Sequence, residues 1–391
     1  MKIILFANTE WYLYNFRLSL AQALRSEGHE VVLVSPPGKY SKRLEEAGFR
    51  WISFPFSTRG TNPLAELATI WRLRNLYRME KPDAVHHFTI KCVLYGSLAA
   101  QAAGTRRVIN AITGLGFVFI GRGRRERRLR WLVKSLYRVA LKNTQVVFQN
   151  EDDRALFFDL GLVKVNQVCL IPGSGVDTSR FVVEPASALP GVPALAGVPE
   201  TRPESPALIV LPARMLWDKG VREFVEAAKI LKDQGVSARF ALVGDTDPDY
   251  PACVPEQQLN EWQSSGIVEW WGWQEDMLAV YHRAQIVCLP SYREGLPRTL
   301  VEAAACGRVL VAADVPGCRS IVRQGVNGLL VPVKDGKALA EALRTLILDP
   351  SLCNEMGRCG REIVLKEYST ERVLVDTLKL YQFEGISGVA A

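Results

Sequence analysis

The chain has 391 residues, of which 48% are hydrophobic and 23% are charged. This composition is ordinary for a globular protein, and the length exceeds that at which one hydrophobic core stops growing, so we expect two domains. The eight cysteines are scattered without a CxxC pair, which disfavours a zinc site or a disulfide framework and is typical of reduced thiols in the cytosol. No apolar run approaches the roughly 20 residues that span a bilayer, and the apolar start of the chain is too short for a signal peptide.

The net charge of +7 is concentrated in one segment. Residues 121–143 contain nine bases and one acid, Glu126, a balance of +8 against the chain's total of +7. The rest of the chain is therefore close to neutral. A function that depends on positive charge is expected to use this segment.

Short apolar runs alternate with helical patterns through the first half of the chain. Runs buried on both faces, separated by helices of this length, predict parallel βαβ units. We therefore expect a doubly wound α/β domain over residues 1–181. Its predicted strands are residues 2–7, 30–35, 84–88, 107–113 and 145–150, and its first helix spans 16–27.

A second series follows a Pro/Ala/Gly-rich passage, residues 182–206, which we interpret as a linker. Residues 207–367 again alternate between apolar runs and helical patterns and predict a second α/β domain. Residues 368–391 include an amphipathic pattern, predicted as a helix that returns to the N-terminal domain. Open parallel sheets bind ligands beyond the carboxyl ends of their strands, so we expect the ligand site in a cleft between the domains.

The stretch SYREGLPRTLVEAAACG, residues 291–307, predicts a helix that starts after a glycine loop. Pro297 suits the first helical turn and Gly307 the position just past the helix end. A helix N-terminus attracts anions, and Gly295 lets a phosphate approach the backbone closely. This loop is therefore a candidate phosphate site.

Two glutamates flank that helix start, Glu294 in the loop and Glu302 inside the helix. A carboxylate beside a phosphate would repel it, so Glu294 more plausibly accepts hydrogen bonds from neutral hydroxyls such as those of a sugar. Arg214 and Lys219, in ARMLWDKG, follow another strand of the same domain and could neutralise a diphosphate. Taken singly, each of these four residues would more often be a solvated surface charge.

The run EGLPRTLVE, with two glutamates separated by seven residues, resembles the retaining nucleotide-sugar glycosyltransferases of family 4. Further motifs carry the same resemblance over nearly the whole chain: ARMLWDKGVREFVEAA, LVGD at 242–245, IPGSGVDTSRF at 171–181 and NGLLVPVKD at 327–335. The resemblance implies the α/β GT-B fold, with two facing Rossmann-like domains and an interdomain cleft.

The resemblance also implies a role for each residue of the second domain. Glu294 would contact hydroxyls of the donor sugar, and Glu302 would bind the ribose. Arg214 and Lys219 would hold the donor diphosphate and stabilise the departing nucleotide. The remaining donor-binding positions would be Gly295, Leu296, Pro297, Gly244 and Asp245. Two cations and a helix N-terminus can act without a metal or a cofactor, and we interpret DTDPD, residues 245–249, as a turn instead of a metal site.

The first domain is expected to bind the acceptor. Strand ends and the loops that follow them carry polar side chains suited to a phosphate or a sugar hydroxyl. Family members often have a glycine pair after the first strand and a histidine near the end of a later one, and this chain departs from both patterns. The candidate acceptor or phosphate residues are Asn15, Arg17, His86, His87, Lys91, Asn110, Thr113 and Gly114.

These departures are themselves similar to a bacterial subgroup of family 4 that builds O-antigens, capsules and other lipid-linked glycans, including N-acetylgalactosaminyl transfer to an undecaprenyl-diphosphate sugar. The resemblance implies retaining transfer of an N-acetylhexosamine or hexose from a UDP-sugar to a polyprenyl-diphosphate-linked glycan, by front-side attack. The alternatives are a nucleotide-sugar epimerase of the same architecture and a non-enzymatic adaptor that binds a membrane or nucleic acid.

The basic segment combines apolar residues at helical spacing with a basic start, which favours binding to a membrane surface. The alternative is a core-packed helix with a solvated basic flank, and no recognition module accompanies it to suggest a nucleic-acid partner. We therefore expect a peripheral protein on the cytoplasmic face of the membrane. The predicted membrane contacts are Arg124, Arg125, Arg127, Arg128, Arg130 and Trp131.

Overall fold

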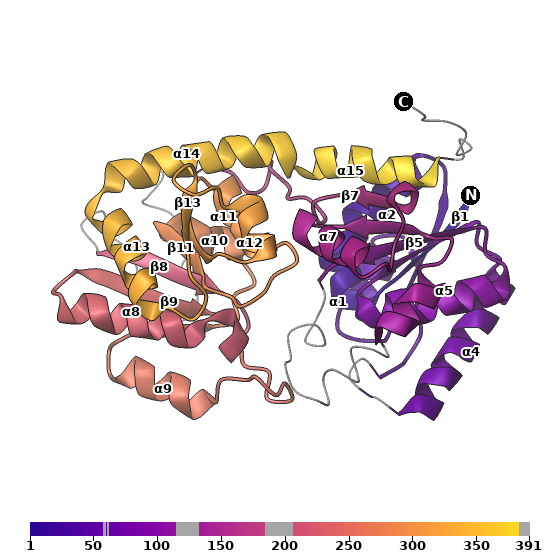
Figure 1. Ribbon diagram of the computed structural model, residues 1–391, viewed down its shortest axis with the longest axis horizontal. Coiled ribbons are helices and arrows are strands. Elements are labelled where there is room, and N and C mark those ends of the chain that lie inside the picture. The colour runs from indigo at the N-terminus through magenta and orange to yellow at the C-terminus, as the bar shows by residue number, and fades with distance from the viewer. Residues whose placement is uncertain (58–59, 61, 115–132, 184–205, 383–391) are drawn as a thin grey trace. The chain divides into compact units, whose positions relative to one another are not determined.

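The computed structural model describes residues 1–57, 60, 62–114, 133–183 and 206–382. The chain divides into two compact units (Figure 1). Unit 1 comprises Met1–Gly175 together with Thr370–Ala391, and unit 2 comprises Val176–Ser369. Each unit is an α/β domain, as the alternating pattern predicts.

Unit 1 is built on a seven-stranded parallel sheet with the strand order β3-β2-β1-β4-β5-β6-β7. Side chains alternate across it, so that Ile3 and Leu5 belong to one core cluster and Ile4 and Phe6 to another. The strands are β1 (Lys2–Phe6), β2 (Glu30–Ser35), β3 (Arg50–Ser53), β4 (Ala84–Phe88), β5 (Arg107–Ile112), β6 (Gln145–Phe148) and β7 (Val168–Leu170).

Helices cover both faces of this sheet. The core on one face includes residues of α2, and the core on the other includes residues of α4 and α5, which pack together. The predicted first helix begins as a π-helix, η1, before it continues as α2. The helices are α1 (Glu10–Tyr12), η1 (Leu13–Arg17), α2 (Leu18–Ser26), α3 (Ser41–Glu46), α4 (Pro63–Glu80), α5 (Ile90–Ala103), residues 133–140, α7 (Glu151–Asp159) and η3 (Val165–Gln167).

Unit 2 has a six-stranded parallel sheet with the order β10-β9-β8-β11-β12-β13. Its strands are β8 (Ala207–Pro212), β9 (Ala238–Val243), β10 (Glu269–Gly272), β11 (Ile286–Leu289), β12 (Val309–Ala313) and β13 (Gly328–Val331). Its helices are η4 (Trp217–Lys219), α8 (Val221–Asp233), α9 (Glu256–Ser264), α10 (Met277–Arg283), α11 (Arg298–Ala305), α12 (Pro316–Ile321), α13 (Gly336–Leu348) and α14 (Pro350–Glu367).

The structure moves the boundary between the two units from residue 181 to residue 175. Val176 and Phe181 are buried in the core of unit 2, where the Phe181 ring lies 6.2 Å from that of Tyr281. Arg361 of α14 donates to the backbone carbonyl of Thr178 over 3.0 Å. The segment therefore packs with the second sheet. Of the expected linker, only residues 182, 183 and 206 lie within the described part of the chain.

The end of the chain belongs to unit 1. Helix α15 (Thr370–Leu378) and the turn η5 (Lys379–Tyr381) follow α14, and Val373, Leu380 and Tyr381 are buried with α2 and the first sheet. Arg107 of β5 donates to the carbonyls of Leu380 and Gln382 over 2.6 and 2.7 Å. Apolar burial and this arginine both fix the returning segment. Among the described residues, no helix is long and apolar enough to cross a membrane.

Candidate active site

The predicted donor residues gather at one edge of the second sheet. Arg214 follows β8, Gly244 and Asp245 follow β9, and Glu294 follows β11. The three strands are parallel and adjacent, so their carboxyl ends meet at the same edge, where such sheets bind ligands.

Lys219 and Glu294 form an ion pair at this edge. The Lys219 ammonium donates to Oε1 of Glu294 over 2.6 Å, and the two side chains retain 23% and 13% of their exposure. The next residue, Gly220, has a φ of 77°, and a Cβ there would lie 2.2 Å from the carbonyl oxygen of Pro290. Only glycine permits this close approach, which presses the turn after η4 against the end of β11.

Arg214 lies at the rim of the same edge. Its side chain is 54% exposed, donates to Oδ2 of Asp247 over 3.0 Å and lies over the ring of Tyr250. Asp245 accepts a hydrogen bond from the backbone N–H of Trp273. Asp245 is thus held by a backbone N–H and Asp247 by a cation, and the Arg214 side chain stays half exposed.

Gly244 joins the ends of β8 and β9. Its φ is 140°, and a Cβ there would lie 2.0 Å from the carbonyl oxygen of Ala213. Any side chain at this position would push apart the two strand ends that carry Arg214 and Asp245. Gly244 is therefore needed because it has no side chain, which lets the ends of β8 and β9 lie close together.

Helix α11 begins one residue later than the sequence predicts. Pro297 has an extended ψ of 103° and serves as the N-cap, and its carbonyl accepts from the N–H groups of Leu300 and Val301. Arg298 is the first helical residue. Gly307, with a φ of 69°, follows the C-cap as expected.

Glu302 is a buried acceptor and not the solvated residue of the alternative interpretation. It is 8% exposed, and its two oxygens accept hydrogen bonds from the Tyr281 hydroxyl over 3.0 Å and from Arg298 Nε over 2.8 Å. Burial, together with the charge of Glu302, raises the pKa of Tyr281 well above its ordinary value. Each carboxylate oxygen has two lone pairs, so Glu302 can accept further hydrogen bonds.

Gly317 of α12 supports the loop that carries Glu294 and Gly295. A Cβ at Gly317 would lie 2.4 Å from the carbonyl oxygen of Gly295 and 2.7 Å from that of Glu294. Sequence analysis does not identify Gly317 or Gly220 as part of the site. The only sequence signals are the K-G pair after ARMLWD and the P-G pair that opens α12. Both indicate a turn, but neither indicates which residues the glycine packs against.

In unit 1, the structure places His86, His87 and Asn110 inside the domain, and this corrects their assignment as acceptor contacts. The His87 ring bonds to the Tyr77 hydroxyl over 3.0 Å and to Oδ1 of Asn110 over 2.9 Å. Nδ1 of His86 lies 2.6 Å from the hydroxyl of Tyr381. All three are at most 2% exposed, so they hold strands and helices together beneath the surface. Burial lowers the pKa of His87 to about 4, which keeps the ring neutral.

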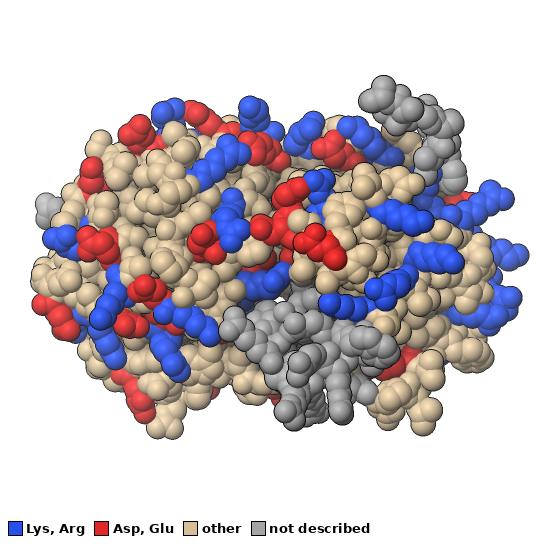
Figure 2. Space-filling view, viewed as in Figure 1, with Lys and Arg blue, Asp and Glu red and all other residues tan. Residues whose placement is uncertain are grey.

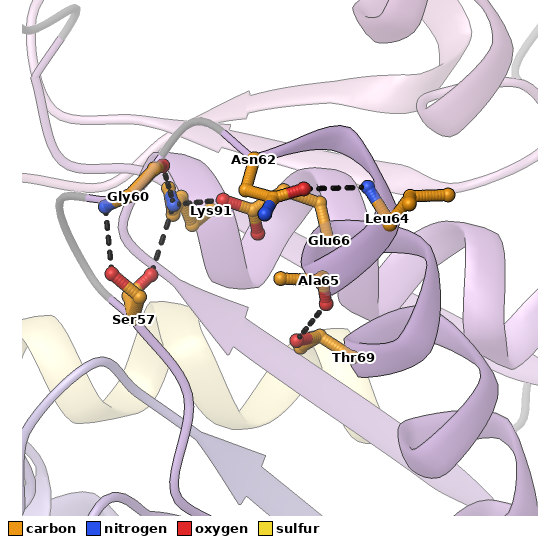
Figure 3. A network of polar contacts seen from close by, with 8 residues as sticks. All are labelled: Ser57, Gly60, Asn62, Leu64, Ala65, Glu66, Thr69 and Lys91. Atoms are coloured by element: carbon orange, nitrogen blue, oxygen red, sulfur yellow. Dashed lines mark hydrogen bonds and ion pairs between the residues drawn. The ribbon is translucent and has the colours of Figure 1, made fainter.

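Lys91 also has a structural role (Figure 3). Its ammonium donates to the carbonyls of Ser57 and Gly60 over 2.9 and 2.6 Å and to Glu66 over 2.6 Å. These three acceptors match its three N–H donors. Lys91 therefore ties the start of α4 to the preceding loop, and its expected role in binding the acceptor stays a prediction.

Arg17, the last residue of η1, is 5% exposed and fixes the helical segment after β1. It donates to the Gly173 carbonyl and the Tyr12 hydroxyl, and its guanidinium lies 4.3 Å from the centre of the Phe88 ring. Asn15 donates to the carbonyl of Trp11. The candidates that remain partly exposed in this unit are Asn15, Lys91, Thr113 and Gly114.

Sequence analysis does not identify the aromatic side chains of α1 and η1, the helical segment after β1, as candidates. Trp11 and Tyr12 lie 5.2 and 5.0 Å from the ring of Phe16, and Trp11 is 36% exposed. The signal is the run WYLYNF in a loop where a glycine pair is expected. Aromatic faces at a strand end are suited to contact with a sugar ring or a lipid.

The predicted membrane contacts Arg124, Arg125, Arg127, Arg128, Arg130 and Trp131 lie outside the described residues. Residues 133–140 are helical, and Tyr137 and Ala140 are buried in the core against α5 and α7. The described end of the basic segment is therefore core-packed.

Comparison with known proteins gives the same architecture. The crystal structure of Anabaena HepE in complex with UDP matches with a TM-score of 0.77 at 19% identity, over 97% of this chain and 99% of that one. WaaG, a glycosyltransferase involved in lipopolysaccharide biosynthesis, matches with a TM-score of 0.71 at 15% identity, over 96% and 98%. Two Rossmann-like units with parallel sheets define the GT-B class of fold, and the prediction of that fold is confirmed.

The sequence comparisons are more specific. Residues 2–151 match the glycosyl transferase 4-like family model, and residues 206–349 match glycosyl transferases group 1. The Campylobacter jejuni N,N'-diacetylbacillosaminyl-diphospho-undecaprenol alpha-1,3-N-acetylgalactosaminyltransferase is 30% identical over 94% of this chain and 95% of its own length. An Escherichia coli UDP-Gal:alpha-D-GlcNAc-diphosphoundecaprenol alpha-1,3-galactosyltransferase is 23% identical over 79% and 78%. The chain belongs to the family 4 glycosyltransferases and is a glycosyltransferase.

Proposed function

We propose that the protein is a retaining transferase that moves an N-acetylhexosamine or a hexose from a UDP-sugar to a polyprenyl-diphosphate-linked glycan, in the synthesis of a bacterial surface polysaccharide or glycan. The observation that carries the proposal is the Lys219–Glu294 pair, 2.6 Å apart, at the carboxyl edge of the second sheet, where Arg214 also follows a strand. The names of the C. jejuni and E. coli relatives support a lipid-linked acceptor. The UDP in the HepE structure supports the nucleotide.

In this proposal, the site stabilises a leaving group. When the bond between the anomeric carbon and the diphosphate breaks, negative charge develops on the phosphate oxygens. Arg214 has outward N–H groups and Lys219 two N–H groups beyond the one given to Glu294, and these would bind that charge. Glu294 would accept hydrogen bonds from sugar hydroxyls, and Glu302, at the inner side of α11, from the ribose.

The retaining step is proposed as a front-side attack without a resident metal or cofactor. The acceptor hydroxyl oxygen forms a bond with the anomeric carbon as the bond to the diphosphate breaks, and the departing phosphate oxygen takes the hydroxyl proton. Both events occur on one face of the sugar, so the anomeric configuration is kept. The anomeric proton coupling of the product, measured by NMR, tests this, and an inverted product would contradict it.

The deciding experiment offers UDP-, GDP- and dTDP-sugars with a short polyprenyl-diphosphate-sugar acceptor. We expect mass spectrometry to show a lipid extended by one sugar, with UDP donors only and in the presence of EDTA. Release of nucleotide without an extended lipid would indicate hydrolysis. An altered UDP-sugar without an acceptor would favour an epimerase, and either result would contradict the proposed transfer.

We also propose that the basic segment, residues 122–130, attaches the enzyme to the cytoplasmic leaflet. The support is its six arginines in nine residues and the lipid named in the acceptors of the relatives. Flotation with anionic vesicles tests it, using a variant in which Arg124, Arg125, Arg127 and Arg128 are changed to serine. Equal binding by this variant and the parent would contradict the attachment.

A further inference from the structure

Helix α4 of unit 1 exposes large apolar side chains. Leu64, Leu67, Trp71 and Met79 are 78%, 62%, 61% and 74% exposed. Single exposed apolar residues are normal, but several on one helix indicate an interaction surface. We call these four residues the α4 ridge.

The ridge lies on the side of the helix that faces away from the sheet. Leu64, Leu67 and Trp71 are spaced by three and four residues and therefore share one face. Leu73 and Tyr77, on the opposite face, are buried in the core with β1 and α5. The helix thus has an apolar side facing the domain and a second apolar side facing water.

The start of α4 is firmly anchored, so the exposure of Leu64 and Leu67 does not arise from a frayed end. The side chain of Asn62 caps the helix by accepting from the N–H of Leu64 over 3.1 Å. One turn later, Glu66 pairs with Lys91, which also holds the loop before the helix (Figure 3). The ridge is therefore displayed on a rigid element.

The charge around the ridge is positive. The two acids of α4 are both neutralised by bases from other elements: Glu66 by Lys91, and Glu80 by Lys2 and Arg50 at 2.6 and 2.7 Å. Hydrogen bonds from Arg50 and then Lys2 lower the pKa of Glu80 to about 2. The bases of the helix, by contrast, form no ion pair with an acid among the residues that the structure describes.

Arg74 and Arg78 lie on the ridge side of α4. Arg74 donates to the carbonyl of Ala102 at the end of α5, and Arg78 is exposed, as is Lys81 at the C-cap. Figure 2 shows tan surface at the lower right, where α4 begins in Figure 1, and blue side chains along the right edge, over the end of α4 and α5. Apolar and basic surfaces are thus adjacent on one helix.

We propose that the α4 ridge is a membrane-docking surface that enters the interface of an anionic bilayer, separate from the basic segment 122–130. An amphipathic helix in the bilayer interface presents Leu and Trp to the acyl boundary and Arg to the headgroups, because long basic side chains reach the charged layer while their stems stay apolar. The ridge and its arginines have this arrangement.

A second copy of the chain fits the ridge less well than a bilayer does. In a two-fold symmetric dimer the same patch meets itself, so Arg74 and Arg78 of one copy would face the arginines of the other. A bilayer that contains anionic lipids supplies the opposite charge. The inference rests on the proposed function only in that a lipid-linked acceptor would bring the enzyme to a membrane.

Flotation tests the apolar part, with vesicles of phosphatidylglycerol and phosphatidylcholine. Leu67→Ser combined with Trp71→Ser should weaken binding about tenfold or more, because interfacial binding scales with the apolar area buried. The matched control is Val165→Ser combined with Leu348→Ser, which are 81% and 61% exposed elsewhere and should leave binding unchanged. Binding of the ridge variant at the parent's affinity would overturn the proposal.

A second measurement tests the charge. Arg74→Gln with Arg78→Gln should lower binding to vesicles with phosphatidylglycerol about tenfold or more and leave binding to pure phosphatidylcholine unchanged, because basic side chains are attracted to an anionic surface. The control pair is Arg344→Gln with Arg358→Gln, also exposed bases but in unit 2. If both double variants lose the same amount of vesicle binding, the effect is one of general charge, and a specific role for α4 is overturned.

Insertion has a direct readout in quenching by brominated lipids. The chain has nine tryptophans, and Trp71→Phe should remove most of the quenched fluorescence if Trp71 enters the acyl region. Unchanged quenching in this variant would contradict insertion. If the ridge variant instead lowers the mass measured by ultracentrifugation and keeps its vesicle binding, the surface is an interface between two copies.

The failure of this inference can be told apart from failure of the proposed function. Transfer to a short, water-soluble polyprenyl-diphosphate-sugar should be the same in the ridge variant and the parent, which also shows that the variant is folded. A parent that binds vesicles through the ridge but never extends a lipid acceptor would refute the proposed transfer and leave the docking surface intact.

Discussion

At the scale of single residues, the candidate site depends on one ion pair held by one glycine. Lys219 and Glu294 come from loops 75 residues apart in sequence, and they meet because Gly220 packs on the carbonyl of Pro290. The pair can orient the Lys219 ammonium toward a diphosphate, while the Glu294 carboxylate stays next to that ammonium. Both members of the pair can be tested separately.

Removing either side chain should mainly affect the rate. Glu294→Ala and Lys219→Ala are each expected to lower kcat by about a hundredfold or more, which is typical for the loss of one group that stabilises developing charge. The thermal unfolding midpoint should change little. Lys229→Ala, an exposed lysine on α8, is the control in steady-state assays with the UDP-sugar. Full activity in Glu294→Ala would remove the role assigned to this carboxylate.

Gly220 allows a comparison with a matched glycine. Gly220→Ala should destabilise unit 2 by about 2–4 kcal/mol, because a left-handed conformation costs an alanine about 1–2 kcal/mol and the new methyl group overlaps Pro290. Gly235 has a similar φ of 72° with open space around it, so Gly235→Ala should incur only the conformational cost. Urea unfolding measures both, and equal losses would show that the contact with Pro290 is unimportant.

At the scale of elements, β4 and β5 are joined by a neutral buried histidine. His87 bonds to Tyr77 of α4 and Asn110 of β5, and a Cβ at Gly96 of α5 would lie 2.5 Å from its ring. The motif HHFTIK suggests a surface site from sequence. In the structure its histidines connect the sheet to its helices.

The pKa of His87 predicts a pH dependence of stability. Its folded value of about 4 lies below the unfolded value of 6.5, so the unfolded chain binds the proton more tightly. Stability is therefore retained above pH 6.5 and lost as the pH falls toward 4, by up to about 3 kcal/mol at 1.36 kcal/mol per pKa unit. Urea midpoints at pH 7 and 4.5 should differ less in His87→Gln than in the parent or in His29→Gln. The same difference in all three would contradict this assignment.

At the scale of the whole molecule, the chain ends by returning to the unit in which it began. Tyr381 is 1% exposed, bonds to His86 and lies in the core beneath α15. Arg107 holds the carbonyls on either side of it. The integrity of unit 1 therefore depends on contacts between residues 273 and 295 positions apart in sequence.

Truncating this contact should destabilise unit 1. Tyr381→Ala is expected to cost about 3–5 kcal/mol, as for other buried aromatic residues, and Tyr381→Phe about 1–2 kcal/mol, because the His86 nitrogen loses its partner. Val375→Ala, at a position that is 52% exposed on the preceding helix α15, should change stability by less than about 0.5 kcal/mol. Denaturant unfolding monitored in unit 1 checks the series. A neutral Tyr381→Ala would show that the returning segment is not part of the folded core.

The sequence by itself determined the parallel α/β character of both units, the positions of Arg214, Lys219 and Glu294 after strands of the second sheet, and that of Glu302 inside a helix, because apolar periodicity and Gly/Pro signals are local. Tertiary structure decided which polar residues are accessible. The histidines of β4, Asn110 and Lys91 each bond to a partner distant in sequence, and no local pattern distinguishes such a residue from a surface ligand. The sequence also does not predict that one apolar side of α4 is exposed, because a helix that is apolar on two sides has the same composition as a buried helix.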